Sequence, residues 1–173
     1  MKKVLIVVDM QNDFIDGALG TKEAQAIVPN VVEKIKNWEG DIIITQDTHK
    51  ENYLETREGK YLPVEHCIRG TKGWELNAEV KEALDAKNAY KSYVEKNSFG
   101  EIVVAEKCFM QNYDYIEFIG LCTEICVINN LLLVKALCPE VDVAVDASCC
   151  AGVTPDGHEA ALLVAKSCQV KIL

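Results

Sequence analysis

The sequence predicts an α/β fold in which a mostly parallel sheet is covered by helices on both faces. Short runs of β-branched and aromatic residues recur along the chain and alternate with longer segments of helical periodicity. Some of these runs, such as LIVV at 5–8, have no polar alternation, which is typical of strands buried on both sides. Strands that alternate with helices pair in parallel, so we expect three layers, α/β/α.

The expected elements follow in order along the chain. Strands are predicted at residues 4–8, 41–45, 113–119, 141–145 and 169–173. Helices are predicted at residues 21–38, 75–86, 124–137 and 155–167. The last helix has Pro155 in its first turn and Thr154 as its cap. Thr123 is the expected N-cap of the helix at 124–137, which places Cys126 at the third helical position.

Length and composition indicate a single domain over residues 1–173, because no linker rich in Pro, Gly or Ser and no internal repeat divides the chain. The net charge of −9 argues against nucleic acid or an anionic membrane as a partner. The apolar run before Asp9 is too short for a signal peptide, and no segment has the roughly 18 apolar residues of a membrane span. We therefore expect a cytoplasmic protein with reduced thiols.

Polar residues follow several of the predicted strands. Asp9 follows the first strand, Asp47 and His49 follow the second, and a turn with Cys126 follows a later one. In parallel sheets the ligand site forms beyond the carboxyl ends of the strands, so these residues are candidates for one site. An aspartate such as Asp9 also serves commonly as a turn or capping residue, and that alternative stays open.

Cys126 is the candidate nucleophile. The first amides of a helix have no intrahelical partner and carry partial positive charge, which favours thiolate over thiol. The alternative is that Cys126 is a small buried apolar residue, as free cysteines commonly are.

Asp47 and His49 form a candidate metal pair. A two-residue spacing in extended chain places both side chains on the same side, where a hard or borderline cation could bind both. Such a pair can also serve only as hydrogen-bonding residues of a loop.

Five motifs occur in a fixed order: DMQNDF at 9–14, TQDTH at 45–49, LPVEHCIRGTKGWEL at 62–76, EKNSF at 95–99 and GLCTEICV at 120–127. Together they resemble the isochorismatase-like cysteine hydrolases, and among these most closely the pyrazinamidase/nicotinamidase family. The resemblance implies a Rossmann-like sandwich and a catalytic triad of Asp9, Lys96 and Cys126. The carboxylate would accept the thiol proton, and the ammonium would favour the thiolate. Lys91 and Lys107 are nearby competitors for the lysine, but Lys96 is followed by NSF as in the family.

The resemblance also implies a backbone oxyanion hole. Family members have a non-proline cis peptide bond four residues before the nucleophile, which here is the bond between Leu121 and Cys122. The amides of Cys122 and Cys126 would then point to one oxyanion.

A metal site is implied as well, with Asp47, His49 and His66 as ligands. Glu58 is the candidate fourth ligand, and Glu55 is the alternative. Two imidazoles and carboxylates suit Zn²⁺ first, with Fe²⁺ or Mn²⁺ as other choices. His158, the third histidine, is expected to be structural or exposed.

The expected reaction is metal-dependent hydrolysis of nicotinamide to nicotinate and ammonia through a thioester, a step of NAD salvage. The pyridine nitrogen would bind the metal, and Phe14 would form a wall of the pocket. Tyr61 and Leu62 stand where nicotinamidases commonly have tryptophan, so another small amide, a carbamoyl compound or a ureide is an alternative substrate. A silent binding domain is a further alternative, disfavoured because all triad positions are retained. Relatives are often homo-oligomers, and we expect one here.

Overall fold

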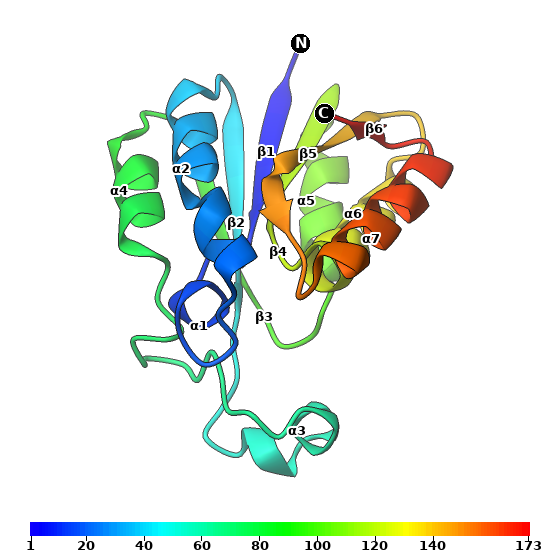
Figure 1. The fold of residues 1–173 in the computed structure, drawn as a ribbon. Helices are drawn as coiled ribbons and strands as arrows, with labels where there is room; N and C mark the ends of the chain where they lie inside the picture. The colour runs from blue at the N-terminus through cyan, green and yellow to red at the C-terminus, as the bar shows by residue number, and fades with distance from the viewer.

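A computed structural model describes residues 1–173 and has a six-stranded, entirely parallel sheet at its centre (Figure 1). The strand order is β3-β2-β1-β4-β5-β6, which confirms the predicted parallel α/β architecture. The strands are β1 (Lys3–Val8), β2 (Asp41–Asp47), β3 (Lys91–Lys96), β4 (Tyr115–Leu121), β5 (Asp142–Ala151) and β6 (Lys171–Ile172).

Helices cover both faces of the sheet, as Figure 1 shows. One face is covered by α2 (Lys22–Asn37) and α4 (Ala78–Ala86), and the other by α5 (Ile102–Gln111), α6 (Ile128–Leu137) and α7 (Pro155–Ser167). Short elements occupy the connections: α1 (Asn12–Ile15), the 3₁₀ turn η1 (Tyr53–Glu55), α3 (Arg57–Tyr61) and the π-helical turn η2 (Thr123–Val127). None of the helices is long and apolar enough to cross a membrane.

Two apolar cores lie on opposite sides of the sheet. Strand β1 shows why its sequence has no polar alternation: Val4, Ile6 and Val8 enter one core, while Leu5 and Val7 enter the other. All five side chains are fully buried. A strand covered on both faces needs apolar residues at successive positions.

Strand β3 and helix α5 were missing from the predicted elements. The sequence of β3, KSYVEK, alternates between buried and exposed positions, because β3 lies at the edge of the sheet. Its polar residues conceal it from a search for apolar runs. Strand β5 also continues six residues past its predicted end, with a register irregularity between Phe118 and Gly120 of the neighbouring β4.

Two predicted helix starts are confirmed. The Thr21 hydroxyl accepts a hydrogen bond from the Ala24 amide at the start of α2. The Thr154 hydroxyl accepts one from the Gly157 amide, and Pro155 is the first residue of α7. Both caps satisfy amides that lack intrahelical acceptors.

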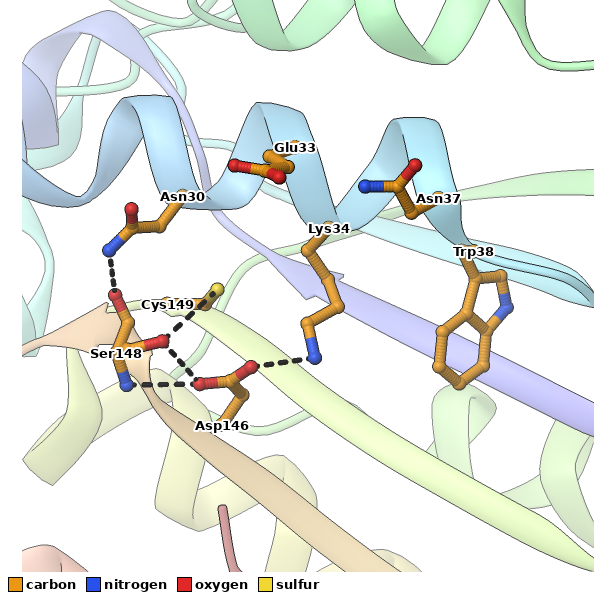
Figure 2. A pocket seen from close by; sticks show the side chains of 8 residues that line it. All are labelled: Asn30, Glu33, Lys34, Asn37, Trp38, Asp146, Ser148 and Cys149. Carbon is orange, nitrogen blue, oxygen red and sulfur yellow. Dashed lines mark hydrogen bonds and ion pairs between the residues drawn. The ribbon is translucent and has the colours of Figure 1, made fainter.

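A polar cavity of about 430 Å³ lies between α2 and β5 (Figure 2). Lys34 forms ion pairs with Asp146, at 2.6 Å, and with Glu117 of β4, at 2.8 Å. Trp38, which follows α2, stacks on Tyr115 at the start of β4. None of the residues that line this cavity belongs to the polar group that follows the strands at their carboxyl ends.

Candidate functional site

The predicted site residues meet at the carboxyl edge of four neighbouring strands. Asp9 follows β1, Asp47 ends β2, Lys96 ends β3, and the turn that bears Cys126 follows β4. Because β3, β2, β1 and β4 are adjacent in the sheet, these residues converge although they are far apart in sequence.

Lys96 lies at the centre of this group and is 2% exposed. Its Nζ is 2.7 Å from Asp9 Oδ2 and 3.4 Å from Cys126 Sγ. The ammonium also donates to the Ser98 carbonyl oxygen at 3.1 Å. The structure thus brings together the three residues expected to form the triad. Lys91, the competitor, donates instead to carbonyl oxygens at the end of α4.

Asp9 is fully buried and has a backbone φ of 46°. This left-handed conformation is uncommon for a residue other than glycine. It turns the chain out of the line of β1, so that pairing with β2 ends there. The Thr45 hydroxyl donates to Asp9 Oδ1 at 2.7 Å, while Oδ2 forms the ion pair with the Lys96 ammonium. The carboxylate is therefore held in one orientation beside the thiol.

Electrostatics in the site differ from the expectation of a preformed thiolate. Burial raises the pKa of the Cys126 thiol, the Asp9 carboxylate raises it further, and the Lys96 ammonium opposes them. Burial also raises the pKa of Asp9 against the attraction of Lys96. The raised pKa of Cys126 favours its thiol form over the thiolate, and Asp9 lies where it can accept the thiol proton.

The turn that carries Cys126 is π-helical, which corrects the expected α-helical start. The Val127 amide donates to the Cys122 carbonyl five residues back, at 3.1 Å, and the α-helix begins only at Ile128. Thr123 is not the cap, because its hydroxyl is hydrogen-bonded to His158 Nδ1 at 2.8 Å. His158 therefore has a structural contact, as expected.

Two asparagines stabilise this turn and were missed from the sequence. Asn129 donates to the Ile125 carbonyl and Asn130 to the Cys126 carbonyl, each at 2.8 Å. Wide turns leave carbonyls without regular helical donors, and side-chain amides four residues later can satisfy them. In the sequence, the adjacent Asn129 and Asn130 shortly after Cys126 were the only local indication of this irregular turn.

The peptide bond between Leu121 and Cys122 is cis, as the family resemblance implied. The Cys122 amide makes no hydrogen bond within the chain and is free to donate to a ligand. Cys126 lies in the same short turn, so the arrangement is compatible with a backbone oxyanion hole.

Four potential metal ligands form a second cluster. One ligand atom each from Asp47, His49, Glu58 and His66 lies within 4.8 Å of all the others. His49 Nε2 is 2.9 Å from Asp47 Oδ2, and His66 Nε2 is 3.6 Å from the same oxygen. Glu55, the alternative to Glu58, is exposed and outside the cluster.

The donor set fits a divalent metal ion. Glu58 Oε1 is 3.6 Å from His49 Nε2 and 3.7 Å from His66 Nε2. Tetrahedral ligands bonded at about 2.1 Å would be about 3.4 Å apart, close to these separations. His66 Nδ1 donates to the Val64 carbonyl at 2.8 Å, which leaves Nε2 available for a metal.

Electrostatics favour the ionised form of Asp47, and packing fixes the two histidine rings. Burial opposes ionisation of Asp47, but the nearby His49 and His66 rings and the Lys96 ammonium hold the pKa of its carboxyl well below the usual range. Both imidazole rings pack against the buried Tyr53, with centroids 4.7 Å and 4.9 Å away. Burial raises the pKa of Glu58.

A cavity of about 790 Å³ is lined by His49 and Glu58 of the metal cluster and by Asn97 and Ile125, the sequence neighbours of Lys96 and Cys126. Tyr61 and Leu62 line it, and Tyr61 is 79% exposed. Phe14 is not on its wall; it packs behind His66, with ring centroids 5.6 Å apart. Phe99 and Ile125 also line the cavity and were missed, although both belong to motifs that contain triad residues.

Comparisons with known proteins identify the family of the chain. The isochorismatase domain model matches residues 3–173. A Bacillus subtilis protein described as an uncharacterized isochorismatase family protein PncA is 30% identical over 145 residues, which cover 75% of this chain and 76% of that protein.

Solved structures of nicotinamidases and pyrazinamidases have the same fold as this chain. The nicotinamidase/pyrazinamidase PncA from Bacillus subtilis superposes with a TM-score of 0.84 and 26% identity, over 99% of both chains. The pyrazinamidase of Pyrococcus horikoshii in complex with zinc gives a TM-score of 0.82 and 29% identity, over 100% of this chain and 99% of that one.

Proposed function

This chain belongs to the isochorismatase family, and we propose that within it the protein is a metal-dependent nicotinamidase that releases ammonia from nicotinamide. The observation that carries the proposal is that a buried thiol, carboxylate and ammonium lie in contact, with a four-ligand metal cluster next to them. Related structures named nicotinamidase or pyrazinamidase support this choice of substrate.

In the first half of the reaction, Asp9 accepts the proton of the Cys126 thiol as sulfur attacks the carboxamide carbon. The tetrahedral oxyanion accepts hydrogen bonds from the amides of Cys122 and Cys126. Asp9 then transfers the proton to the departing nitrogen. The carbon–nitrogen bond breaks, ammonia leaves, and a thioester on Cys126 remains.

In the second half, Asp9 accepts a proton from water as the water oxygen attacks the thioester carbon. The carbon–sulfur bond breaks, the proton on Asp9 returns to Cys126, and nicotinic acid is released and loses its remaining proton to solvent as nicotinate. Lys96 remains charged throughout, because neighbouring carboxylates raise its pKa well above the usual value in spite of burial. Its charge stabilises the anionic forms of Asp9 and Cys126.

Asp47, His49, Glu58 and His66 would hold the metal ion, with Zn²⁺ as the first choice and Fe²⁺ or Mn²⁺ as alternatives. When bound, the ion would supply a Lewis-acidic contact for the pyridine nitrogen and orient the ring. Tyr61, Leu62 and Phe99 would surround the ring.

The test is ammonia release by the Zn²⁺-loaded protein from nicotinamide and from a panel of small amides, carbamoyl compounds and ureides. The proposal predicts that nicotinamide has the highest kcat/KM of the panel. A higher value for a carbamoyl compound or ureide would keep the cysteine hydrolase and reject nicotinamide as the substrate.

A further inference from the structure

Gln11 is a buried glutamine that the proposed mechanism does not use. Its Oε1 accepts a hydrogen bond from the Asp47 amide at 2.7 Å, and its Nε2 donates to the Asp47 carbonyl at 2.8 Å. The second Nε2 hydrogen goes to the Trp74 carbonyl, also at 2.8 Å. The side chain is 0% exposed and is held by three hydrogen bonds.

These contacts replace a missing strand neighbour. Pairing of β1 with β2 ends at Val8 and Thr45, because the chain turns away at Asp9. The Thr45 carbonyl still accepts from the Asp9 amide, and Asp47, two residues further, directs its backbone groups to the same side. Without Gln11, both backbone groups of Asp47 would be buried and unpaired on that side.

We propose that Gln11 is a positioning residue of the metal centre, which acts by fixing the backbone of Asp47 so that its carboxylate meets the other three ligands. Asp47 Oδ2 faces His49 and His66, while Oδ1 faces Lys96. A shift of this backbone would therefore move the carboxylate relative both to the metal ligands and to Lys96. Groups that orient metal ligands typically change metal affinity by about 10- to 100-fold.

Gln46 provides a matched control. It is also a glutamine at the end of β2, and its Nε2 donates to the same Trp74 carbonyl, at 3.3 Å. It makes no hydrogen bond to the backbone of Asp47. A general effect of losing a glutamine beside Trp74 would therefore occur in both variants, whereas an effect through Asp47 requires Gln11.

The experiment is titration of the metal-free protein with Zn²⁺ against a competing chelator, well below the unfolding temperature, with folding verified by circular dichroism. We expect Gln11→Met to bind Zn²⁺ about 10- to 100-fold more weakly than wild type, and Gln46→Met to bind as wild type does. A shift in unfolding temperature without a change in Zn²⁺ affinity would overturn the proposal. If Gln11→Met does not fold, Gln11→Asn, which keeps the amide, replaces it with the same predicted direction.

A double-mutant cycle tests whether the effect passes through Asp47. In an Asp47→Ala background the carboxylate is absent, so Gln11→Met should cause no further loss of Zn²⁺ affinity. An equal further loss would overturn the proposal. The inference depends on the proposed function only for metal binding at this cluster. A protein that binds Zn²⁺ but does not hydrolyse nicotinamide would therefore refute the nicotinamidase proposal and leave this test valid.

Discussion

Lys96 Nζ lies 3.1 Å from Asp47 Oδ1, and this contact joins the proposed triad to the proposed metal cluster. The other oxygen of the same carboxylate is 2.9 Å from His49 Nε2. One buried ammonium therefore contacts the carboxylates of both Asp9 and Asp47, so the two parts of the site share one positive charge.

Lys96→Met should abolish activity and destabilise the protein. The substitution leaves two buried carboxylates without their cation, and breaking such buried pairs typically costs about 3–5 kcal/mol. We expect kcat to fall at least about 1000-fold, the scale of losing a key electrostatic group in an active site. Lys91→Met is the control, since Lys91 contacts only backbone carbonyls away from the site. Comparable losses in both variants, measured by ammonia release and urea unfolding, would contradict the assignment of Lys96.

His66→Ala should lower bound Zn²⁺, because it removes one of the four clustered ligands. Metal analysis after dialysis against Zn²⁺ checks this directly. His158→Ala is the control: it removes the contact with Thr123 but no atom of the cluster, so the metal content should match wild type. Equal metal content in the two variants would argue that the cluster does not hold the ion.

Gly157→Ala should reduce activity although alanine favours helices. A Cβ at Gly157 would lie 2.4 Å from Glu124 Oε1, which accepts from the Val153 amide at 2.8 Å. Displaced Glu124 would disturb the neighbouring turn with Cys126. In a Glu124→Ala background the two closest contacts are removed and Thr154 Oγ1, at 3.2 Å, is the nearest remaining atom. Alanine at position 157 should then stabilise the helix by up to about 1 kcal/mol. A single variant as active and stable as wild type would contradict this account.

Lys34→Met should destabilise the protein in a pH-dependent way. Burial opposes ionisation of Asp146, but Lys34 and Ser148 lower the pKa of its carboxyl below the usual value. Stability from a lowered carboxyl pKa is present above the unfolded pKa of about 3.9 and is lost as the pH falls through the folded value.

We therefore expect Lys34→Met to cost about 1–3 kcal/mol at pH 7, below the full cost of breaking a buried pair because Lys34 is partly exposed. The difference from wild type should shrink at pH 3. Lys36→Met, on an exposed position of the same helix, should stay within about 0.5 kcal/mol of wild type at both pH values. Urea unfolding measures both variants, and a pH-independent cost for Lys34→Met would contradict the ion-pair explanation.

Most of the sheet and most of the site could be predicted because short sequence patterns, namely apolar runs and the polar residues after them, indicate both. Apolar runs identified β1, β2 and β4, and the residues after them included Asp9 and Asp47. Edge strand β3 was missed, because its buried positions alternate with exposed ones and most of its residues are polar. Lys96, at the end of that strand, was therefore found only by its motif and not by its place in the fold.

Other features could not be predicted from local sequence because they depend on tertiary contacts. The hydroxyl of Thr123 hydrogen-bonds to His158 instead of capping a helix, and a π-helical turn forms in place of an α-helical start. The pKa of Cys126 is raised by burial and by the Asp9 carboxylate, which together outweigh the Lys96 ammonium. These are long-range effects of how the sheet edge packs.

The central claim is a thioester on Cys126, and acid quenching of the Zn²⁺-loaded protein during nicotinamide turnover, followed by peptide mass spectrometry, tests it most directly. The account predicts one nicotinoyl group on the peptide that contains Cys126, and loss of both the adduct and ammonia release in Cys126→Ala. Cys168→Ala, which alters a half-buried thiol at the end of α7, should retain both. Ammonia release by Cys126→Ala at the wild-type rate would contradict the claim.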